Sequence, residues 1–205
     1  MTSRRSFLLL VTLIPLISGA AAQASSDDAT ALVKRTAERM LKTLEARRAE
    51  VNRDPAIIYG MIEDILAPHF DFQKITQGAL GQHWRQASPA QQKALMDGFK
   101  QVLVRTYARS LLNYSGEEIR YLPAKAGSKE NTVTVSTEVR APGATPIPVD
   151  YRMYKASGGW KVFDVIINNA SLVSNYRSSF STEIRQNGID GLIAKIGDMN
   201  RKGQG

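Results

Sequence analysis

The 205-residue sequence contains no cysteine, which excludes a disulfide framework and thiol catalysis. Its only histidines are His69 and His83, and neither has acidic neighbours at metal-ligand spacing. The sequence also lacks a phosphate loop, a G-x-S-x-G elbow and an H-E-x-x-H motif. We therefore expect no metal, no other cofactor and no catalytic residue set.

Residues 1–24 have the pattern of an export signal. Arg4 and Arg5 form a basic start, an apolar run follows, and Ala22-Gln23-Ala24 resembles an A-x-A cleavage site. The apolar run is too short for a stable membrane span. The two arginines leave a twin-arginine signal and an ordinary secretory signal both open. We predict that residues 25–205 form a single domain outside the cytoplasm.

The charge balance is basic, with a formal net charge of +8 that removal of Arg4 and Arg5 with the signal lowers to +6. A moderate positive field suits an anionic membrane surface or acidic partner proteins. A solvated basic surface without a ligand is the alternative. We expect no nucleic acid partner for an exported protein.

The hydrophobic period changes from helical to strand-like along the chain. Helices are predicted at 27–51, from Asp54-Pro55 onward, at 70–80 as a short helix or turn pair, and from the Ser88 capping box to about 113. Strands are predicted at 118–122, 133–140, 147–154 and 160–167, followed by a helix that ends at Gly188, a short helix at 189–196 and a frayed tail from residue 200. We therefore predict an α+β domain with a twisted antiparallel sheet of about four strands.

The strand at 160–167 is apolar on both faces. Strict alternation places Trp160, Val162 and Ile166 on one side, and Phe163, Val165 and Ile167 on the other. Such a strand is covered on both faces, by packed protein or by something bound. The pattern alone leaves open whether the apolar faces fill a dry core or line a cavity.

Asp164 interrupts this apolar strand. A buried carboxylate can act as a base, and Tyr151 or Tyr154 would complete an isomerase dyad. The alternative is that Asp164 pairs with a basic side chain or with backbone donors. The polar residues that follow, Asn168, Asn169, Ser171 and Ser174, suit a helix cap, and Arg177 beyond them would also suit a bound phosphate.

Three long segments carry a resemblance: FDFQKITQGALGQHWRQASPAQQKALMDGF at 70–99, LVRTYARSL at 103–111 and GWKVFDVIINNASLVSNYRSSF at 159–180. They resemble the MlaC / toluene-tolerance (Ttg2-type) family of periplasmic phospholipid-binding proteins, across essentially the whole mature chain. The resemblance implies an NTF2-like twisted sheet with packed helices around a deep apolar pocket. It also implies a carrier rather than an enzyme, which moves phospholipid between an outer-membrane lipoprotein–porin complex and an inner-membrane ABC transporter, and so maintains outer-membrane asymmetry.

For this pocket we predict a lining of apolar and aromatic side chains on the faces described above: Phe72, Ile75, Trp84, Phe99, Leu103, Tyr107, Tyr151, Met153, Val165, Ile167, Val173, Tyr176 and Phe180. Lys161 and Arg177 are predicted to touch the phosphate headgroup. We expect a monomer. A hopanoid cargo in the same family, and an isomerase of the same fold with Asp164 as its base, stay open as alternatives.

Overall fold

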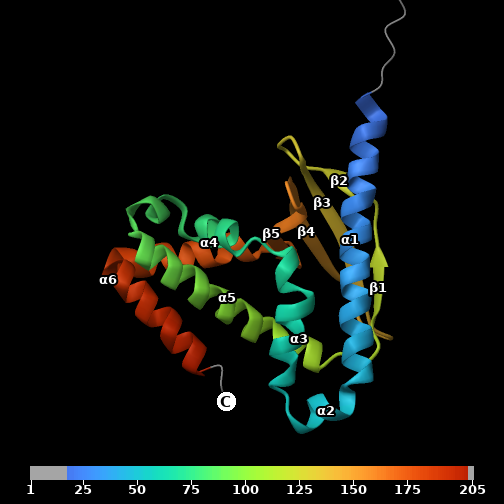
Figure 1. The fold of residues 1–205 in the computed structure, drawn as a ribbon, viewed down its shortest axis with the longest axis horizontal. Coiled ribbons are helices and arrows are strands. Elements are labelled where there is room, and N and C mark those ends of the chain that lie inside the picture. The colour runs from blue at the N-terminus through green and yellow to red at the C-terminus, as the bar shows by residue number, and fades with distance from the viewer. Residues whose placement is uncertain (1–17, 203–205) are drawn as a thin grey trace, which may run out of the picture.

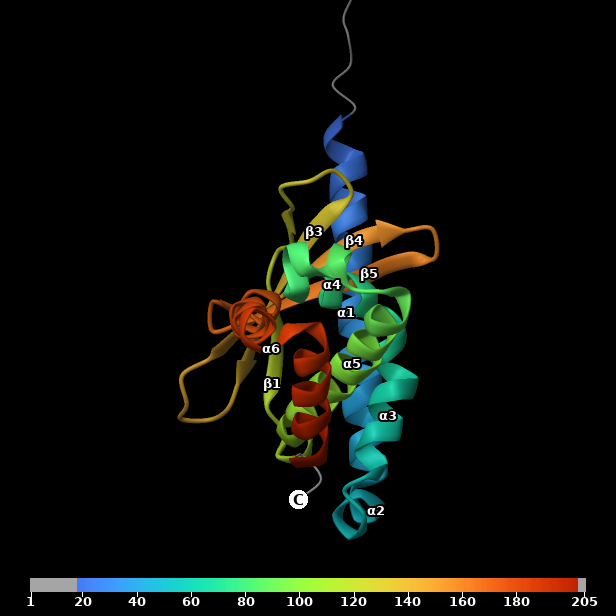
Figure 2. The same ribbon diagram turned by 90° about the vertical axis from the view of Figure 1, so that its left-hand side faces the viewer.

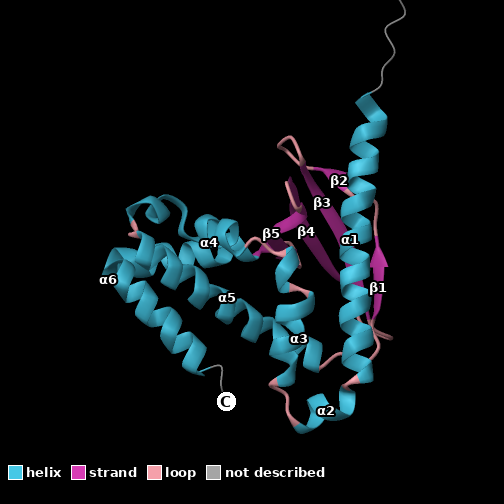
Figure 3. Ribbon diagram, in the orientation of Figure 1, coloured by secondary structure: helices cyan, strands magenta, loops and turns pink. Residues whose placement is uncertain are grey.

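The computed structural model describes residues 18–202 (Figure 1). Its helices are α1 (Ser18–Ala46), α2 (Arg48–Arg53), α3 (Ile57–Ile65), the 3₁₀ turn η1 (Ala67–His69), α4 (Phe72–Leu80), the 3₁₀ turn η2 (Gly81–Gln86), α5 (Pro89–Leu112) and α6 (Leu172–Lys202). Its strands are β1 (Glu118–Tyr121), β2 (Lys125–Ala126), β3 (Thr132–Arg140), β4 (Ile147–Ala156), β5 (Gly159–Ile167) and β6 (Ala170–Ser171). Figure 3 shows that the strands form one continuous region among the helices.

The sheet is antiparallel, with strand order β1-β3-β4-β5-β6. β2 pairs with β3 on the same edge as β1. Short connections join β3 to β4 and β4 to β5, as expected for a meander of neighbouring strands. The α+β class with an antiparallel sheet, predicted from the sequence, is confirmed, and the short strands β2 and β6 are additions to it.

One part of the strand prediction is wrong, because β5 does not alternate strictly. Val162 pairs with Met153 of β4, but Val165 pairs with Tyr151, so the register shifts and Phe163 is an extra residue. An extra residue in one strand is a β-bulge, which reverses the facing of everything beyond it. Val165 therefore lies on the same face as Val162, where strict alternation had placed it opposite.

The helix α1 packs against the sheet along one part of its length and against other helices along another. At the middle of α1, Ala29 and Val33 pack against Val133, Met153 and Val162 in a buried cluster. Farther along, α1 contributes to a second cluster with α3 and α5. Figure 1 shows α1 running along the sheet, with α4, α5 and α6 gathered on the other side of the molecule, where they form a third cluster.

Helix ends agree with the sequence where a side chain caps the backbone. The predicted capping box is present, since Gln91 N donates to Ser88 Oγ and Ser88 N donates to Gln91 Oε1. The helix predicted from Pro55 instead begins at Ile57, because the Asp54 carboxylate accepts a hydrogen bond from Ala56 N and forms a turn first. The helix predicted over 27–51 is divided between α1 and α2.

The C-terminal helix is interrupted at Gly188, as predicted, by a backbone with φ 73° and ψ −177°. The frayed tail predicted from residue 200 is wrong as far as Lys202. Asn200 Nδ2 donates to the carbonyl of Gly98, and Arg105 donates to the carbonyl of Asn200, so this end is bound to α5. Residues 203–205 lie outside the described part.

The predicted export signal lies mostly outside the described residues, which begin at Ser18 in α1. Its removal after Ala24 therefore stays a prediction. Across residues 18–202, each helix is either too short or too polar to cross a bilayer.

Candidate binding cavity

A cavity of about 520 Å³ lies between the sheet and the helices. Ala37, Met40 and Leu41 of α1 form one wall of it. The other walls come from the α3 and η1 region, α4, the second half of α5 and the residues after it, the sheet with its β3–β4 turn, and the start of α6: Ile62, Leu66, Ala67, Phe70, Phe72, Ile75, Leu103, Val104, Tyr107, Ser110, Leu111, Tyr114, Glu117, Ile119, Val139, Ala141, Ala144, Thr145, Ile147, Val149, Tyr151, Asp164, Val165, Ile167, Leu172 and Val173. Ligand pockets typically measure about 300–1,000 Å³, so the volume suits a bound organic molecule.

The lining is mostly aliphatic and aromatic. Among the described residues, no lysine or arginine contributes to it. Burial raises the pKa of Tyr107 and of Tyr151, so both phenols stay neutral at physiological pH. The cavity therefore favours an apolar occupant and offers no cation to a charged group.

Most of the lining predicted from the sequence does face this cavity: Phe72, Ile75, Leu103, Tyr107, Tyr151, Val165, Ile167 and Val173. Contact of these side chains with a lipid stays a prediction. Val165 reaches the cavity because of the bulge at Phe163, which turns it to the same face as Tyr151.

The other predicted lining residues lie elsewhere: Trp84, Phe99, Met153, Tyr176 and Phe180. Phe99 packs edge-on against Tyr176 and Phe180, with ring centroids 4.7 Å and 5.0 Å away, and this cluster joins α5 to α6. Trp84 packs on the same cluster, and Met153 is fully buried under α1. Helical spacing identified apolar faces, but α5 has protein on several sides, so only some of those residues meet the cavity.

The sequence prediction missed two walls. Residues of α1 and α3, among them Met40, Leu41 and Ile62, line the cavity, as do Ala144 and Ile147 beside the β3–β4 turn. Val33, Ala37, Met40 and Leu44 recur at helical spacing in the sequence, but the sequence does not show which surface this apolar stripe faces. Only the long-range packing of α1 across the sheet determines what that stripe faces.

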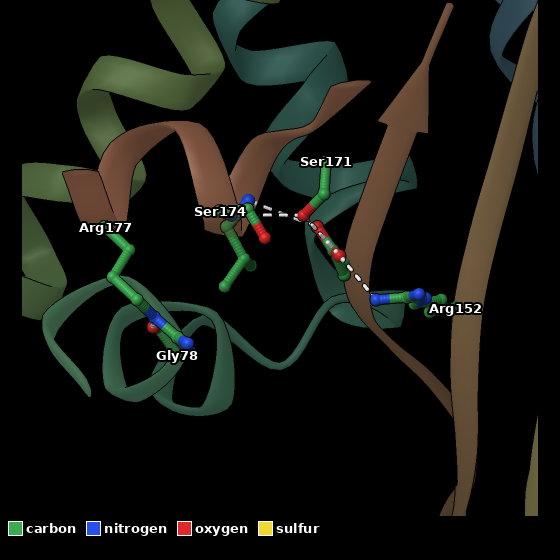
Figure 4. A network of polar contacts seen from close by, with 7 residues as sticks. Gly78, Arg152, Ser171, Ser174 and Arg177 are labelled. Carbon is green, nitrogen blue, oxygen red and sulfur yellow. Dashed lines mark hydrogen bonds and ion pairs between the residues drawn. The ribbon is translucent and has the colours of Figure 1, made fainter. Parts of the chain in front are cut away.

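The two predicted headgroup residues lie outside this lining and are bonded to backbone carbonyls. Lys161 Nζ donates to Pro68 O at 2.5 Å, and Arg177 Nε donates to Gly78 O at 2.7 Å, the latter shown in Figure 4. Lys161 borders a second cavity of about 360 Å³, which shares Phe70 and Phe72 with the first. A headgroup contact for either cation stays a prediction.

Asp164 lies at the edge of the cavity, 4% exposed, with donors to both carboxylate oxygens. Oδ2 accepts from Ser171 Oγ at 2.7 Å and from Arg152 Nη1 at 3.4 Å, and Oδ1 accepts from the backbone N of Val173 at 3.2 Å. Figure 4 shows Ser171 and Arg152 on either side of this contact, with Ser174 N donating to Ser171 Oγ. The carboxylate thus holds the start of α6 against β5, which matches the structural alternative stated from the sequence.

Of the two tyrosines considered as partners of Asp164, Tyr151 lines the cavity and Tyr154 binds a different carboxylate. Tyr154 OH donates to Asp71 Oδ2 at 2.5 Å, and this bond raises the pKa of Tyr154 to about 12. Of the predicted cap residues, Ser171 does accept a helix N–H. Asn168 and Asn169 instead have positive φ angles of 50° and 63° and form the turn between β5 and β6.

The fold and the site together define an α+β protein whose antiparallel sheet and helices enclose an apolar cavity. The model of the MlaC protein family matches residues 34–198, and the chain belongs to this family. The family resemblance stated from the sequence is therefore confirmed.

Related proteins agree with this membership. Toluene tolerance protein ttg2D of Pseudomonas putida is 29% identical over 188 residues, which cover 91% of this chain and 85% of that protein. The intermembrane phospholipid transport system binding protein MlaC of Haemophilus influenzae is 23% identical over 168 residues, 80% of this chain and 78% of that one. A solved structure of a phospholipid-binding protein from Ralstonia solanacearum, in complex with a phospholipid, aligns with a TM-score of 0.80 and 32% identity, over 87% of this chain and 99% of that chain.

Proposed function

We propose that this chain is a periplasmic phospholipid carrier of an Mla-type pathway, exported by residues 1–24. In this role it moves phospholipid between an outer-membrane lipoprotein–porin complex and an inner-membrane ABC transporter complex, and so maintains the lipid asymmetry of the outer membrane. The observation that carries the proposal is the apolar cavity of about 520 Å³ between sheet and helices. The phospholipid bound to the similar Ralstonia solanacearum protein supports acyl chains as its occupant.

The chemistry of the lining explains which part of a phospholipid such a carrier would hold inside the cavity and which part it would leave outside. Burying one CH₂ group is worth about 0.8 kcal/mol, so about ten groups of an acyl chain contribute about 8 kcal/mol. No described lysine or arginine lines the cavity, so no cation within it attracts the phosphate. The tails therefore supply the affinity, the headgroup stays near the mouth, and binding depends little on headgroup type.

The direct test is lipid mass spectrometry on protein expressed from the full sequence and purified without detergent. We expect phospholipid in near-stoichiometric amount, with a range of headgroups. A hopanoid in its place would assign the carrier a polycyclic cargo. A protein that is empty and also takes up no lipid from vesicles would overturn the carrier function.

A pair of variants locates the lipid. Val149→Glu places a charge on the cavity face of the sheet, whereas Thr134→Glu places it on the opposite face, where the paired residue of β4 is Arg152. We expect Val149→Glu to purify without lipid and Thr134→Glu to carry the full amount. Val149→Phe fills the cavity without a charge, so it keeps the test informative if the glutamate variant fails to fold. Equal lipid content in all three proteins would place the lipid elsewhere.

A further inference from the structure

The turn that joins β3 to β4, taken with the first two residues of β4, has an unusual composition. Residues 141–148 read APGATPIP, without a single charged side chain and with three prolines. Thr145 carries the only polar side chain of the segment. In Figure 2 this hairpin projects at the lower left, beyond the helices.

The hairpin is also the place where the cavity meets solvent. The lining residues that are exposed are Ser110 on α5 and three residues of this hairpin, Ala144, Thr145 and Ile147. Ile147 is 43% exposed, and it is the one exposed large apolar side chain among residues 26–202. An apolar surface therefore continues from the interior of the cavity to the tip of the hairpin.

The backbone of the hairpin suits an apolar medium. Inserting a loop into hydrocarbon is costly because its N–H groups lose water, and a proline has no N–H group. Pro142, Pro146 and Pro148 therefore remove three donors from an eight-residue segment. Ala144 N bonds to Ala141 O, and Pro148 O accepts from Asn168 N, so two more backbone groups are satisfied internally.

Charged groups lie at the base of the hairpin rather than at its tip. Arg140 donates to Glu138 Oε2 at 2.6 Å, so these two charges neutralise each other. A protein partner normally contributes about one hydrogen bond per 100–200 Å² of interface, and residues 141–148 offer little to bond with. Insertion into a bilayer requires only apolar side chains and few hydrogen-bond donors, and this segment has both properties.

We propose that residues 141–148 insert into the surface of a lipid bilayer and place the mouth of the cavity against it. This inference rests on the proposed carrier function and adds a direct membrane contact to it. Acyl chains then pass between bilayer and cavity along Ile147 and Ala144 without crossing open water. Because the segment is uncharged, the contact depends on apolar insertion and not on the basic field of the protein.

The test uses lipid-depleted full protein and vesicles of pure phosphatidylcholine, with flotation and phospholipid uptake as readouts. Pro146→Asp adds a charge and an N–H group at an exposed hairpin position outside the cavity lining. Ser157→Asp makes a similar change in the exposed turn between β4 and β5. We expect Pro146→Asp to lower the vesicle-bound fraction about tenfold, and Ser157→Asp to leave it unchanged.

The outcomes separate this inference from the function on which it rests. Pro146→Asp should still co-purify with as much phospholipid as the wild type, since the residue is not in the lining. Wild-type binding should persist in high salt, and its loss there would assign the contact to the basic surface and overturn the insertion. Uptake that occurs only after a partner complex is added would overturn it in favour of a protein contact. A wild type that carries no phospholipid would instead refute the carrier function itself.

Discussion

Asp164 is the residue for which the sequence left both a catalytic and a structural role open, and its carboxylate is buried. A charged group in an apolar strand is costly unless donors surround it. Here Ser171, Arg152 and the backbone N of Val173 all donate to it, so its burial is accounted for by the attachment of α6 to the sheet. The same contact fixes Val173, which lines the cavity, so the carboxylate helps to position the cavity wall.

Replacing Asp164 by asparagine should therefore lower stability rather than remove a reaction. The amide keeps one acceptor oxygen and directs an N–H group at a position where a donor already points, so one buried group loses its partner. We expect a loss of about 1–3 kcal/mol in the free energy of unfolding, measured by urea titration. Asp150→Asn on the neighbouring strand, where the carboxylate is only partly buried, is the control. Equal midpoints for the two variants would contradict the attachment role.

At the scale of elements, the sequence predicted well what local rules determine. The capping box at Ser88 and the break at Gly188 were both readable, because each depends on residues within a few positions. The bulge at Phe163 was not, since no local feature distinguishes an extra residue from a regular one. It follows from the pairing of β5 with β4, and it decides that Val165 faces the cavity.

Two glycines, Gly188 in α6 and Gly60 in α3, allow the effect of backbone conformation on stability to be tested apart from side-chain packing. Gly188 and Gly60 both have open space where the methyl group of an alanine would lie, with nothing within 4 Å, but only Gly188 has a positive φ, of 73°. With ψ at −177°, that conformation is one that essentially only glycine adopts. Gly60 lies inside α3, where alanine is the better helix former.

We therefore expect the two alanine substitutions to change stability in opposite directions. Gly188→Ala should destabilise the protein by about 1–3 kcal/mol, because the new side chain forces a strained backbone. Gly60→Ala should stabilise it by about 0.5–1 kcal/mol. Thermal unfolding of both variants beside the wild type measures this. A neutral Gly188→Ala would show that the interruption of α6 relaxes into a continuous helix.

At the scale of the whole molecule, the cavity depends on how α1 crosses the sheet. Ala29 and Val33 of this helix pack on the sheet, whereas Ala37, Met40 and Leu41, farther along it, line the cavity. Hydrophobic periodicity predicted which side chains of these elements turn inward. It could not tell a filled space from an empty one, because that depends on the relative placement of elements far apart in the sequence.

An apolar space of this size makes the stability of the protein depend on its occupant. A ligand that binds the folded state alone stabilises it by about 2.7 kcal/mol at a free concentration a hundred times its dissociation constant. Lipid-depleted protein should therefore unfold at a lower temperature than protein purified with its lipid, and added phospholipid should restore the difference. Scanning calorimetry with and without phospholipid vesicles measures the shift. Val149→Glu should show no shift, whereas Thr134→Glu should respond as the wild type does. If phospholipid does not change the unfolding temperature of the wild type, the space between α1 and the sheet is not where the lipid binds.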